Sequence, residues 1–89
     1  MKAIVTVVGK DQVGIIAAVC VKLAEYNVNV LDISQTVMQG YFTMMMVVDA
    51  SACTLPLAEL VVIMEEMGKE RGLSIRLQRE DIFEAMHRI

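Results

Sequence analysis

The sequence predicts an α+β domain of the ferredoxin-like plan, with a four-stranded antiparallel sheet and two helices on one of its faces. Strand-like and helix-like hydrophobic patterns follow one another in the order β-α-β-β-α-β. The two central strands are separated by about two residues, which only an antiparallel hairpin allows. A chain of 89 residues supports one hydrophobic core, so we expect a single domain over residues 1–89.

The first strand is expected at residues 2–8, a short β-branched run that Gly9 closes. Apolar side chains occupy both its odd and its even positions, and the same holds for the third strand. Two helices cover only one face of a sheet, so the second face should be apolar and bare. We expect a partner there, most simply a second copy of the chain. A C-terminal helix folded over part of that face is the open alternative.

The first helix is expected at residues 13–26, because apolar residues recur there at helical spacing. A polar, glycine-bounded loop at residues 9–14 leads into it. Asp11 or Gln12 is placed to cap the first turn of this helix through its side chain. Asn27 is suited to the left-handed conformation that ends a helix.

The central hairpin is the clearest local signal. Residues 28–39 alternate between apolar and polar, which predicts a half-buried strand. The pair Gln39 and Gly40 is a tight-turn signal. Residues 41–49 follow as the third strand, with an apolar row at the even positions. These two strands should therefore be neighbours in the sheet.

The second helix has recognisable start and stop signals. Ser51 and Thr54 are candidates for its N-cap, and Pro56 fits only in the first turn of a helix. Apolar residues then line one face to about Arg71. Gly72 is expected to end the helix in the left-handed conformation.

The last strand is expected to begin at Leu73, where apolar and polar residues alternate again. The sequence thus divides into a core at residues 1–79 and a tail at residues 80–89. The tail predicts a short terminal helix, because one helical face carries Ile82, Phe83, Met86 and Ile89.

Composition excludes several classes of function. Eight basic and eleven acidic residues give a net charge of −3, which argues against phosphate neutralisation and hence against direct nucleic-acid binding. The hydrophobic fraction of 56% excludes disorder. No apolar run reaches the ~18 residues that span a bilayer, and the N-terminal segment does not resemble a signal peptide. Two cysteines do not make a disulfide framework, so we expect a cytoplasmic protein.

No catalytic or metal-binding set emerges from the sequence. The spacing of the two loop glycines resembles a phosphate-binding loop, but Ile15 and Ile16 stand where Lys and Ser/Thr are required. Cys20 and Cys53 are too far apart for a two-thiolate metal site. His87 has no Ser or Cys nucleophile near it in sequence, so a solvated histidine is the better interpretation. We therefore expect no enzymatic activity, no metal and no cofactor.

The loop before the first helix is the candidate ligand site. The start of a helix exposes unpaired N–H groups and a partial positive charge, which hold a carboxylate without a cationic side chain. Gly14 would let a ligand approach the backbone closely. Asn27 and Asn29, before the second strand, offer amide groups for an amino acid. A structural interpretation fits these residues about equally well on physical grounds alone. In it the glycines only shape a turn and the asparagines only cap, and no ligand binds.

Two segments, GKDQVGII at residues 9–16 and LAEYNVNVLDISQ at residues 23–35, resemble the ACT domain. This small-molecule-sensing module has the same βαββαβ plan and is common in regulators of amino-acid metabolism. The resemblance extends to about Arg79. The whole chain is similar to the stand-alone ACT proteins of the UPF0237 family, and to the domains of the glycine cleavage system transcriptional repressor.

The resemblance implies a homodimer, often with the two sheets side by side. It also implies that an amino acid binds between the loop after the first strand and the start of the partner's second strand. A proline is frequent in the family just before the loop glycine, and Val13 replaces it here, which leaves the loop less pre-organised. The positions that match the family's ligand site are Asp11, Val13, Gly14, Ile15, Asn27, Asn29 and Val30.

We therefore expect a regulatory module that binds a small ligand at a homodimer interface. The expected ligand is an amino acid. No catalytic or DNA-binding domain is attached, so a regulated protein partner is also possible. The rival interpretation is a protein-interaction subunit that docks an enzyme or a transcription factor without any small ligand.

Overall fold

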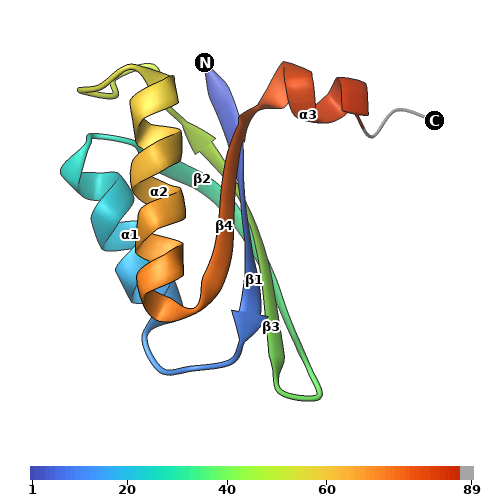
Figure 1. The fold of residues 1–89 in the computed structure, drawn as a ribbon. Coiled ribbons are helices and arrows are strands. Elements are labelled where there is room, and N and C mark those ends of the chain that lie inside the picture. Colours follow the sequence, from blue (N-terminus) through green and yellow to red (C-terminus); the bar gives the residue numbers. More distant parts are fainter. Residues whose placement is uncertain (87–89) are drawn as a thin grey trace.

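The computed structural model describes residues 1–86, and within them it confirms the predicted order of elements (Figure 1). The sheet and its helices make the ferredoxin-like fold, and the predicted terminal helix is present. Ile89 and His87, about which the sequence also made predictions, lie outside the described residues. The elements are β1 (Lys2–Lys10), α1 (Ile15–Glu25), β2 (Asn29–Met38), β3 (Tyr41–Asp49), α2 (Leu57–Arg71), β4 (Leu73–Arg79) and α3 (Glu80–Met86).

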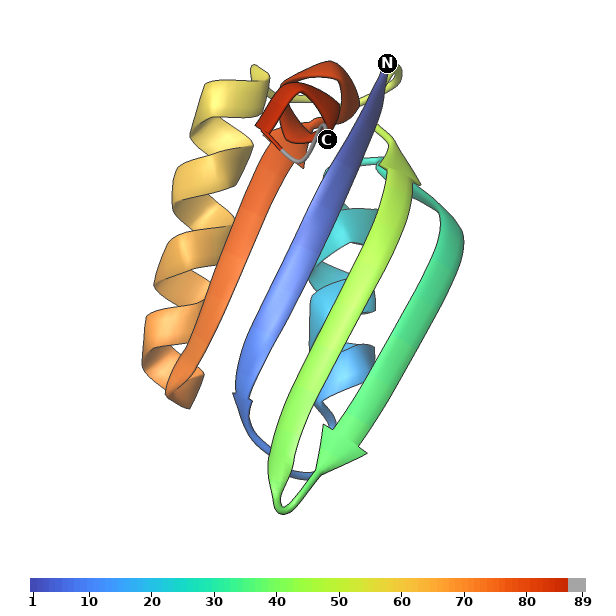
Figure 2. The same ribbon diagram turned by 90° about the vertical axis from the view of Figure 1, so that its right-hand side faces the viewer.

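The four strands form one sheet in the order β2-β3-β1-β4, and every neighbouring pair is antiparallel. Both α1 and α2 pack on the same face of this sheet, as predicted (Figures 1 and 2). The third helix, α3, contacts β1 and β4 instead. The outer strands β2 and β4 are the two edges of the sheet.

The hydrophobic core lies between the sheet and the two helices. The odd-numbered residues of β1 and the even-numbered residues of β3 form adjacent buried rows, as the alternation predicted. Met44 and Met46 are fully buried, while Met45 faces the other side of the sheet. Both helices contribute buried residues at helical spacing, namely Ile15, Val19 and Leu23 from α1 and Leu60, Met64 and Met67 from α2.

The predicted side-chain cap of α1 is wrong. The N-cap position belongs to Gly14, whose φ of 85° lies in the left-handed region, and no side chain caps the first turn. The backbone N–H of Asp11 donates to Gly40, and the side chain of Gln12 donates to Arg71. Because the chain turns into the helix at a left-handed residue, neither side chain reaches the first helical N–H groups. At the other end Asn27 has a φ of 61°, so that prediction is confirmed.

The predicted N-caps of α2 are also wrong. The helix begins directly after Pro56, and no side chain caps it. The hydroxyl of Ser51 donates to Asp49 instead, and the backbone N–H of Thr54 donates to Tyr26. These bonds hold the β3–α2 connection against the neighbouring elements, so the two residues are unable to cap. Gly72 ends α2 with a φ of 71°, as predicted.

The β2–β3 hairpin has the predicted turn and one irregularity that was not predicted. Gln39 and Gly40 have φ values of 50° and 82°, the two successive left-handed residues of a type I′ turn. A β-bulge lies between Val30 and Asp32, which removes Leu31 from the regular pairing with β3. The alternation of side chains along β2 therefore changes phase near its start.

β2 forms a strand as predicted, but the prediction that one of its faces is buried is wrong for this chain. Every β2 residue is exposed except Val30, which is half-buried. Ile33 and Val37 pair with Met46 and Phe42 and so point to the helix side of the sheet. They are uncovered because α1 lies behind β1 and β3 and leaves the edge strand bare (Figure 2).

Candidate functional site

A hollow of about 400 Å³ lies where the loop after β1 enters α1 and faces the bare edge strand β2. Its volume falls in the roughly 300–1,000 Å³ range of small-molecule sites. One wall is the start of α1 and the other is the inner face of β2 and β3. The residues that line it are Asp11, Gln12, Gly14, Ile15, Ile16, Ala17, Gln35, Val37 and Phe42.

The start of α1 carries N–H groups that have no acceptor within the helix. The first bond of the helix runs from the N–H of Ala18 to the carbonyl of Gly14, at 2.9 Å. The three residues between Gly14 and Ala18 have N–H groups with no acceptor in the helix. These residues, Ile15, Ile16 and Ala17, line the hollow. The first turn contains no acidic side chain, so its partial positive charge is left for a ligand.

The loop is fixed to two other elements. The N–H of Asp11 donates to the carbonyl of Gly40 at the tip of the hairpin, at 2.8 Å. The side-chain amide of Gln12 donates to the carbonyl of Arg71 at the end of α2, at 3.0 Å. These two bonds fix the loop beside the hollow, which Asp11 and Gln12 both line.

The sheet supplies one polar and two apolar side chains to the hollow. Gln35 and Val37 come from β2, and Phe42 pairs directly with Val37. All three lie on the helix side of the sheet. The site therefore combines N–H donors, one carboxylate and one amide with an apolar wall. That set of groups matches the ammonium, carboxylate and side chain of an amino acid.

The structure brings together only part of the predicted site. Asp11, Gly14 and Ile15 line the hollow, whereas Val13 is 99% exposed and lies in the groove between α1 and α2. Asn29 begins β2 and pairs with the last residue of β3, at the end of the sheet far from the hollow.

The other strand-two residues share that distant end. The side chain of Asn27 donates to the carbonyl of Ala52 at 3.1 Å, which ties the α1–β2 connection to the β3–α2 connection. Val30 packs against the hydrophobic core. Within one chain, therefore, neither asparagine nor Val30 meets the loop at Gly14.

Six residues of the hollow were missed at the level of sequence: Gln12, Ile16, Ala17, Gln35, Val37 and Phe42. Ile16 and Ala17 could have been found by counting along the first turn of α1 from Gly14, because every residue of a first turn has a free N–H group. The hairpin register could have placed Val37 opposite Phe42. Nothing local predicts that β2 lies beside the start of α1.

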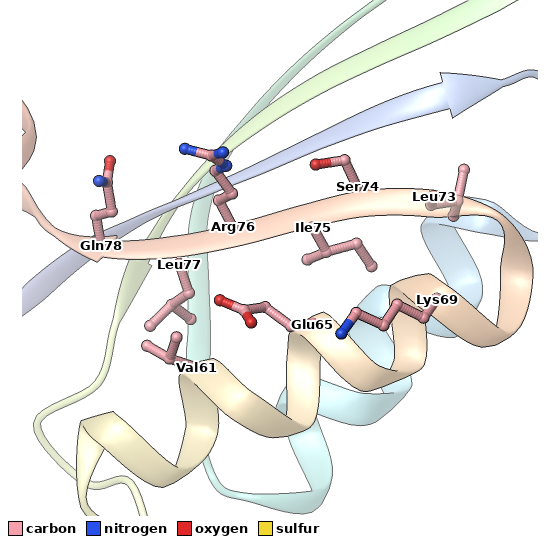
Figure 3. Close-up of a pocket in the computed structure, with 9 residues that line it drawn as sticks. All are labelled: Val61, Glu65, Lys69, Leu73, Ser74, Ile75, Arg76, Leu77 and Gln78. Atoms are coloured by element: carbon pink, nitrogen blue, oxygen red, sulfur yellow. The ribbon is translucent and has the colours of Figure 1, made fainter.

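A second hollow, of about 430 Å³, runs between α2 and the edge strand β4 (Figure 3). Leu73, Ile75 and Leu77 point toward the helix, and Glu65 and Lys69 extend along the groove. The side chains of β4 that point away from the helix are polar. The groove offers no convergent donors for a small anion, so it is a weaker candidate than the hollow at α1.

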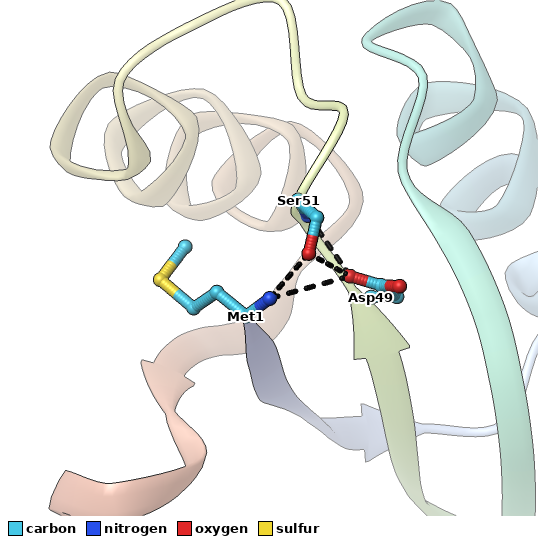
Figure 4. A network of polar contacts seen from close by, with 3 residues as sticks. All are labelled: Met1, Asp49 and Ser51. Atoms are coloured by element: carbon cyan, nitrogen blue, oxygen red, sulfur yellow. Dashed lines mark hydrogen bonds and ion pairs between the residues drawn. The ribbon is translucent and has the colours of Figure 1, made fainter.

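A polar cluster joins the start of β1 to the end of β3 (Figure 4). The N-terminal ammonium of Met1 contacts Ser51 and lies 3.5 Å from the Asp49 carboxylate. The hydroxyl and the backbone N–H of Ser51 both donate to Asp49, at 2.6 and 2.9 Å. These two hydrogen bonds lower the pKa of the Asp49 carboxyl below its ordinary value, and the ammonium adds to the effect.

Three further observations bear on other kinds of site. Among residues 1–86, no group of three His, Cys, Asp or Glu side chains is arranged to hold a metal ion. No helix of the described chain has both the length and the apolar character of a membrane span. Cys20 and Cys53 are free thiols, half-buried against the hydrophobic core.

Comparison with known proteins identifies the family. The family model described as the ACT domain matches residues 2–78. A UPF0237 protein of Bifidobacterium longum is 56% identical over 88 residues, which is 99% of this chain and 98% of the relative. An ACT domain protein from Streptococcus pneumoniae is 47% identical, with a TM-score of 0.82 and 98% of each chain covered.

A more distant likeness concerns the fold alone. A solved structure assigned as a glycine cleavage system transcriptional repressor is 18% identical, with a TM-score of 0.74, and the match covers 86% of this chain and 44% of that one. The family model and the relatives of the same length confirm the resemblance to the ACT domain and to UPF0237 proteins. The chain belongs to the ACT domain family, and its relatives over the full length are UPF0237 proteins.

Proposed function

We propose that this chain is a non-enzymatic regulatory module of the cytoplasm that binds an amino acid between two copies of itself. The observation that carries the proposal is the hollow at the start of α1. Its N–H groups fit a carboxylate, Asp11 fits an ammonium group, and Ile15, Val37 and Phe42 fit an apolar side chain. The ACT domain family, to which the chain belongs, supports a small ligand for this site.

The bare strand β2 supports the participation of a second copy. An edge strand that exposes its backbone and also apolar side chains is a site for pairing with another strand. Two β2 strands that pair antiparallel around Ile33 and Ser34 would bring Asn29 of the partner subunit to the Met38 end of the first. That end also carries the hairpin tip to which the ligand loop is bonded.

Such pairing would complete the site. Asn27, Asn29 and Val30 of the partner subunit would lie at the open side of the hollow, where one chain alone leaves it exposed to water. The paired strands would also cover Ile33 and Val37. The two asparagines would then add amide donors and acceptors to the ligand's ammonium and carboxylate.

The first experiment measures the melting temperature of the protein against each of the twenty amino acids, and its mass with and without the best ligand. We expect one amino acid, or a few of similar shape, to raise the melting temperature and to increase the mass, because the ligand joins two copies. A folded dimer that responds to none of them would contradict the proposal and favour a protein-interaction subunit without a small ligand.

The matched variants are Gly14→Ala and Gly72→Ala. Both glycines have positive φ, and at neither would an added Cβ meet any atom within 4 Å. The backbone cost of a left-handed alanine, about 1–2 kcal/mol, should therefore be similar at the two positions. Gly14 lines the hollow, whereas Gly72 does not. Gly14→Ala should abolish the ligand-induced shift and Gly72→Ala should keep it; a full shift in Gly14→Ala would refute the assignment of the site.

Asp11→Asn tests the chemistry of the ligand. Loss of the carboxylate should weaken an amino acid at least about tenfold, because one charge-assisted hydrogen bond is lost. The affinity for the matching acid without its amino group should stay the same. Equal effects on the two compounds would mean that Asp11 does not hold the ammonium.

A further inference from the structure

The face of the sheet opposite the helices carries an apolar strip along its two central strands. The strip consists of the apolar side chains that β1 and β3 present on this face, and we call it the outer strip: Ile4, Val8, Tyr41, Met45 and Val47. Ile4 pairs directly with Val47, while Thr6 and Thr43 interrupt the strip between its two ends. Polar side chains border it on both edge strands, among them Asp32 on β2 and Arg76 on β4. An apolar centre with a polar rim is the anatomy of a protein–protein interface.

The helix α3 stands on the same side of the molecule as the outer strip. It projects away from the sheet in Figure 1, and Figure 2 looks almost along its axis. Its base is held by the ion pair between Arg79 and Asp81, at 2.7 Å, and by a contact of the Gln78 amide with the sulfur of Met86, at 3.6 Å. It has no buried residue, and Ile82 remains 47% exposed.

The two apolar surfaces lie at opposite ends of this face. α3 contacts β1 and β4 at the end where Ile4 is buried. At the other end, next to the hairpin turn, Val8 and Tyr41 are exposed. One chain thus exposes the apolar side chains of Ile82 and Met86 on α3 at one end of the face, and those of Val8 and Tyr41 at the other.

We propose that the outer strip is an interface with a second copy of this chain, in which two sheets pack face to face and each α3 covers the far end of the partner's strip. The two-fold axis lies midway between the two sheets and runs perpendicular to the strands. It brings the α3 end of one copy to the hairpin end of the other. Ile82 and Met86 of the partner subunit then contact Tyr41 and Val8.

The dimensions of the elements fit this arrangement. Seven helical residues rise about 10 Å, and face-packed sheets lie about 10 Å apart. An α3 that projects from one sheet therefore reaches the partner's sheet and does not hold the two apart. Because α3 stands at one end, it leaves the rest of the outer strip free for the partner.

The charges on this face are complementary to a second copy. α3 carries the acidic residues Glu80, Asp81 and Glu84, while Lys10 lies at the hairpin end and pairs with Tyr41 in the sheet. The proposed two-fold places the acidic helix of each copy over Lys10 of the other. A second copy of this chain therefore matches the face in charge as well as in polarity.

The area of the face is of the order that a stable dimer needs. Four strands at about 4.8 Å spacing, each about 30 Å long, give the whole sheet face about 600 Å² per copy. A standard stable interface has about 800 Å² per partner.

The test uses three identical changes at apolar residues of similar exposure. Met45, Ile82 and Val62 are 42%, 47% and 51% exposed, so a glutamate at each should leave the fold intact. Met45 lies in the outer strip, Ile82 lies on α3, and Val62 lies on α2 at the opposite side of the sheet. Sedimentation velocity on the full chain, without added amino acid, measures the mass, and circular dichroism checks the fold.

The wild-type chain should sediment as at least a dimer. Met45→Glu and Ile82→Glu should each raise the dissociation constant about thirtyfold or more, as buried interface residues do, and so halve the mass at micromolar concentration. Val62→Glu should leave the mass unchanged. A monomeric wild type, or a folded Met45→Glu protein of unchanged mass, would overturn the proposal.

This interface is separate from the proposed ligand site. If Met45→Glu halves the mass but keeps the amino-acid response, both proposals hold. A Met45→Glu protein of unchanged mass that still responds to an amino acid refutes the outer strip alone. If Met45→Glu halves the mass but the wild type responds to no amino acid, the ligand site alone is refuted.

Discussion

At the residue scale, Gly14 links the backbone to the proposed chemistry. Its left-handed conformation lets the chain turn from the loop into α1 without a side-chain cap. A capping side chain would have accepted bonds from the first helical N–H groups and so occupied the proposed ligand site. The missing cap and the open hollow are thus two results of the same residue.

Asp49 gives a prediction about pH. Its pKa is lowered in the folded protein, chiefly by the two hydrogen bonds from Ser51. Its contribution to stability is therefore fully present above the unfolded value of about 4 and is lost as pH falls through the lower folded pKa. Asp49→Asn should reduce the melting temperature at pH 7 and leave it nearly unchanged near pH 2. An equal loss at both pH values would exclude the ionised carboxylate as the cause.

Gly68 gives a prediction about packing. In most helices Gly→Ala stabilises by roughly 0.5–1 kcal/mol. Here a Cβ would lie 2.7 Å from the carbonyl oxygen of Leu73 and 3.0 Å from the Ile75 side chain. Gly68→Ala should therefore destabilise the protein by about 1–3 kcal/mol, because α2 would have to move away from β4. Urea denaturation measures the difference, and a stabilised variant would refute the close approach.

The residues that sequence analysis assigned correctly are those whose role is local. Gly40 and Gly72 were predicted from turn and helix-end signals, and both have positive φ. The caps by Asp11 and Ser51 were wrong because Gly14 and Pro56, which lie further along the chain, hold the N-cap positions. The hydrophobic pattern does not fix the first residue of a helix, so a capping residue type is a prediction only until the start of the helix is known.

At the scale of elements, β2 is the least protected part of the sheet. β1 pairs on both sides, whereas β2 pairs only with β3 and exposes every residue except Val30. Hydrogen exchange should therefore be fast at those β2 amides that point away from β3. Addition of the amino-acid ligand should slow the same amides, because the proposed pairing of two β2 strands gives them acceptors.

The comparison that checks this prediction is β4, the other edge strand. Its outward amides should keep the same exchange rate with and without the amino acid. Equal slowing at β2 and β4 would indicate a general stabilisation and would contradict pairing through β2.

The order of elements was predictable because each pattern is repeated several times within its own segment. The alternation of β3 and the helical spacing of α1 are properties of consecutive residues, and both were confirmed. The exposure of β2 was not predictable, since its apolar residues alternate like those of a buried strand. Whether a helix covers such a strand depends on where two crossovers place their helices.

The candidate site was predictable in part for the same reason. The loop half is continuous in sequence, so Asp11, Gly14 and Ile15 were found together. Gln35 and Val37 reach the hollow only through the sheet. Asn27 and Asn29 lie at the far end of β2 in this chain, and their role depends on a second copy.

At the scale of the whole molecule, ligand and assembly should be linked. A ligand that binds only the paired form stabilises it by RT ln(1 + [L]/Kd), about 2.7 kcal/mol at a hundredfold excess over Kd. The melting temperature should thus rise with the amino acid and also with the protein concentration. A ligand-induced shift that does not depend on protein concentration would indicate a site within one chain.

The two proposed interfaces use different surfaces and predict a mass for each state. The outer strip joins two copies without ligand, and the β2 edges join further copies when the amino acid binds. The wild type should therefore change from dimer to tetramer on ligand addition, while Met45→Glu should change from monomer to dimer. Light scattering coupled to size exclusion separates these masses.

One hydrogen bond described above, from the N–H of Asp11 to the carbonyl of Gly40, has a practical consequence. Through it, the hairpin tip is physically attached to the ligand loop but lies outside the hollow. An isotope label in Gly40 would thus sense events in the loop through its own carbonyl. Saturation of the protein could be followed by nuclear magnetic resonance without modifying any group that touches the ligand.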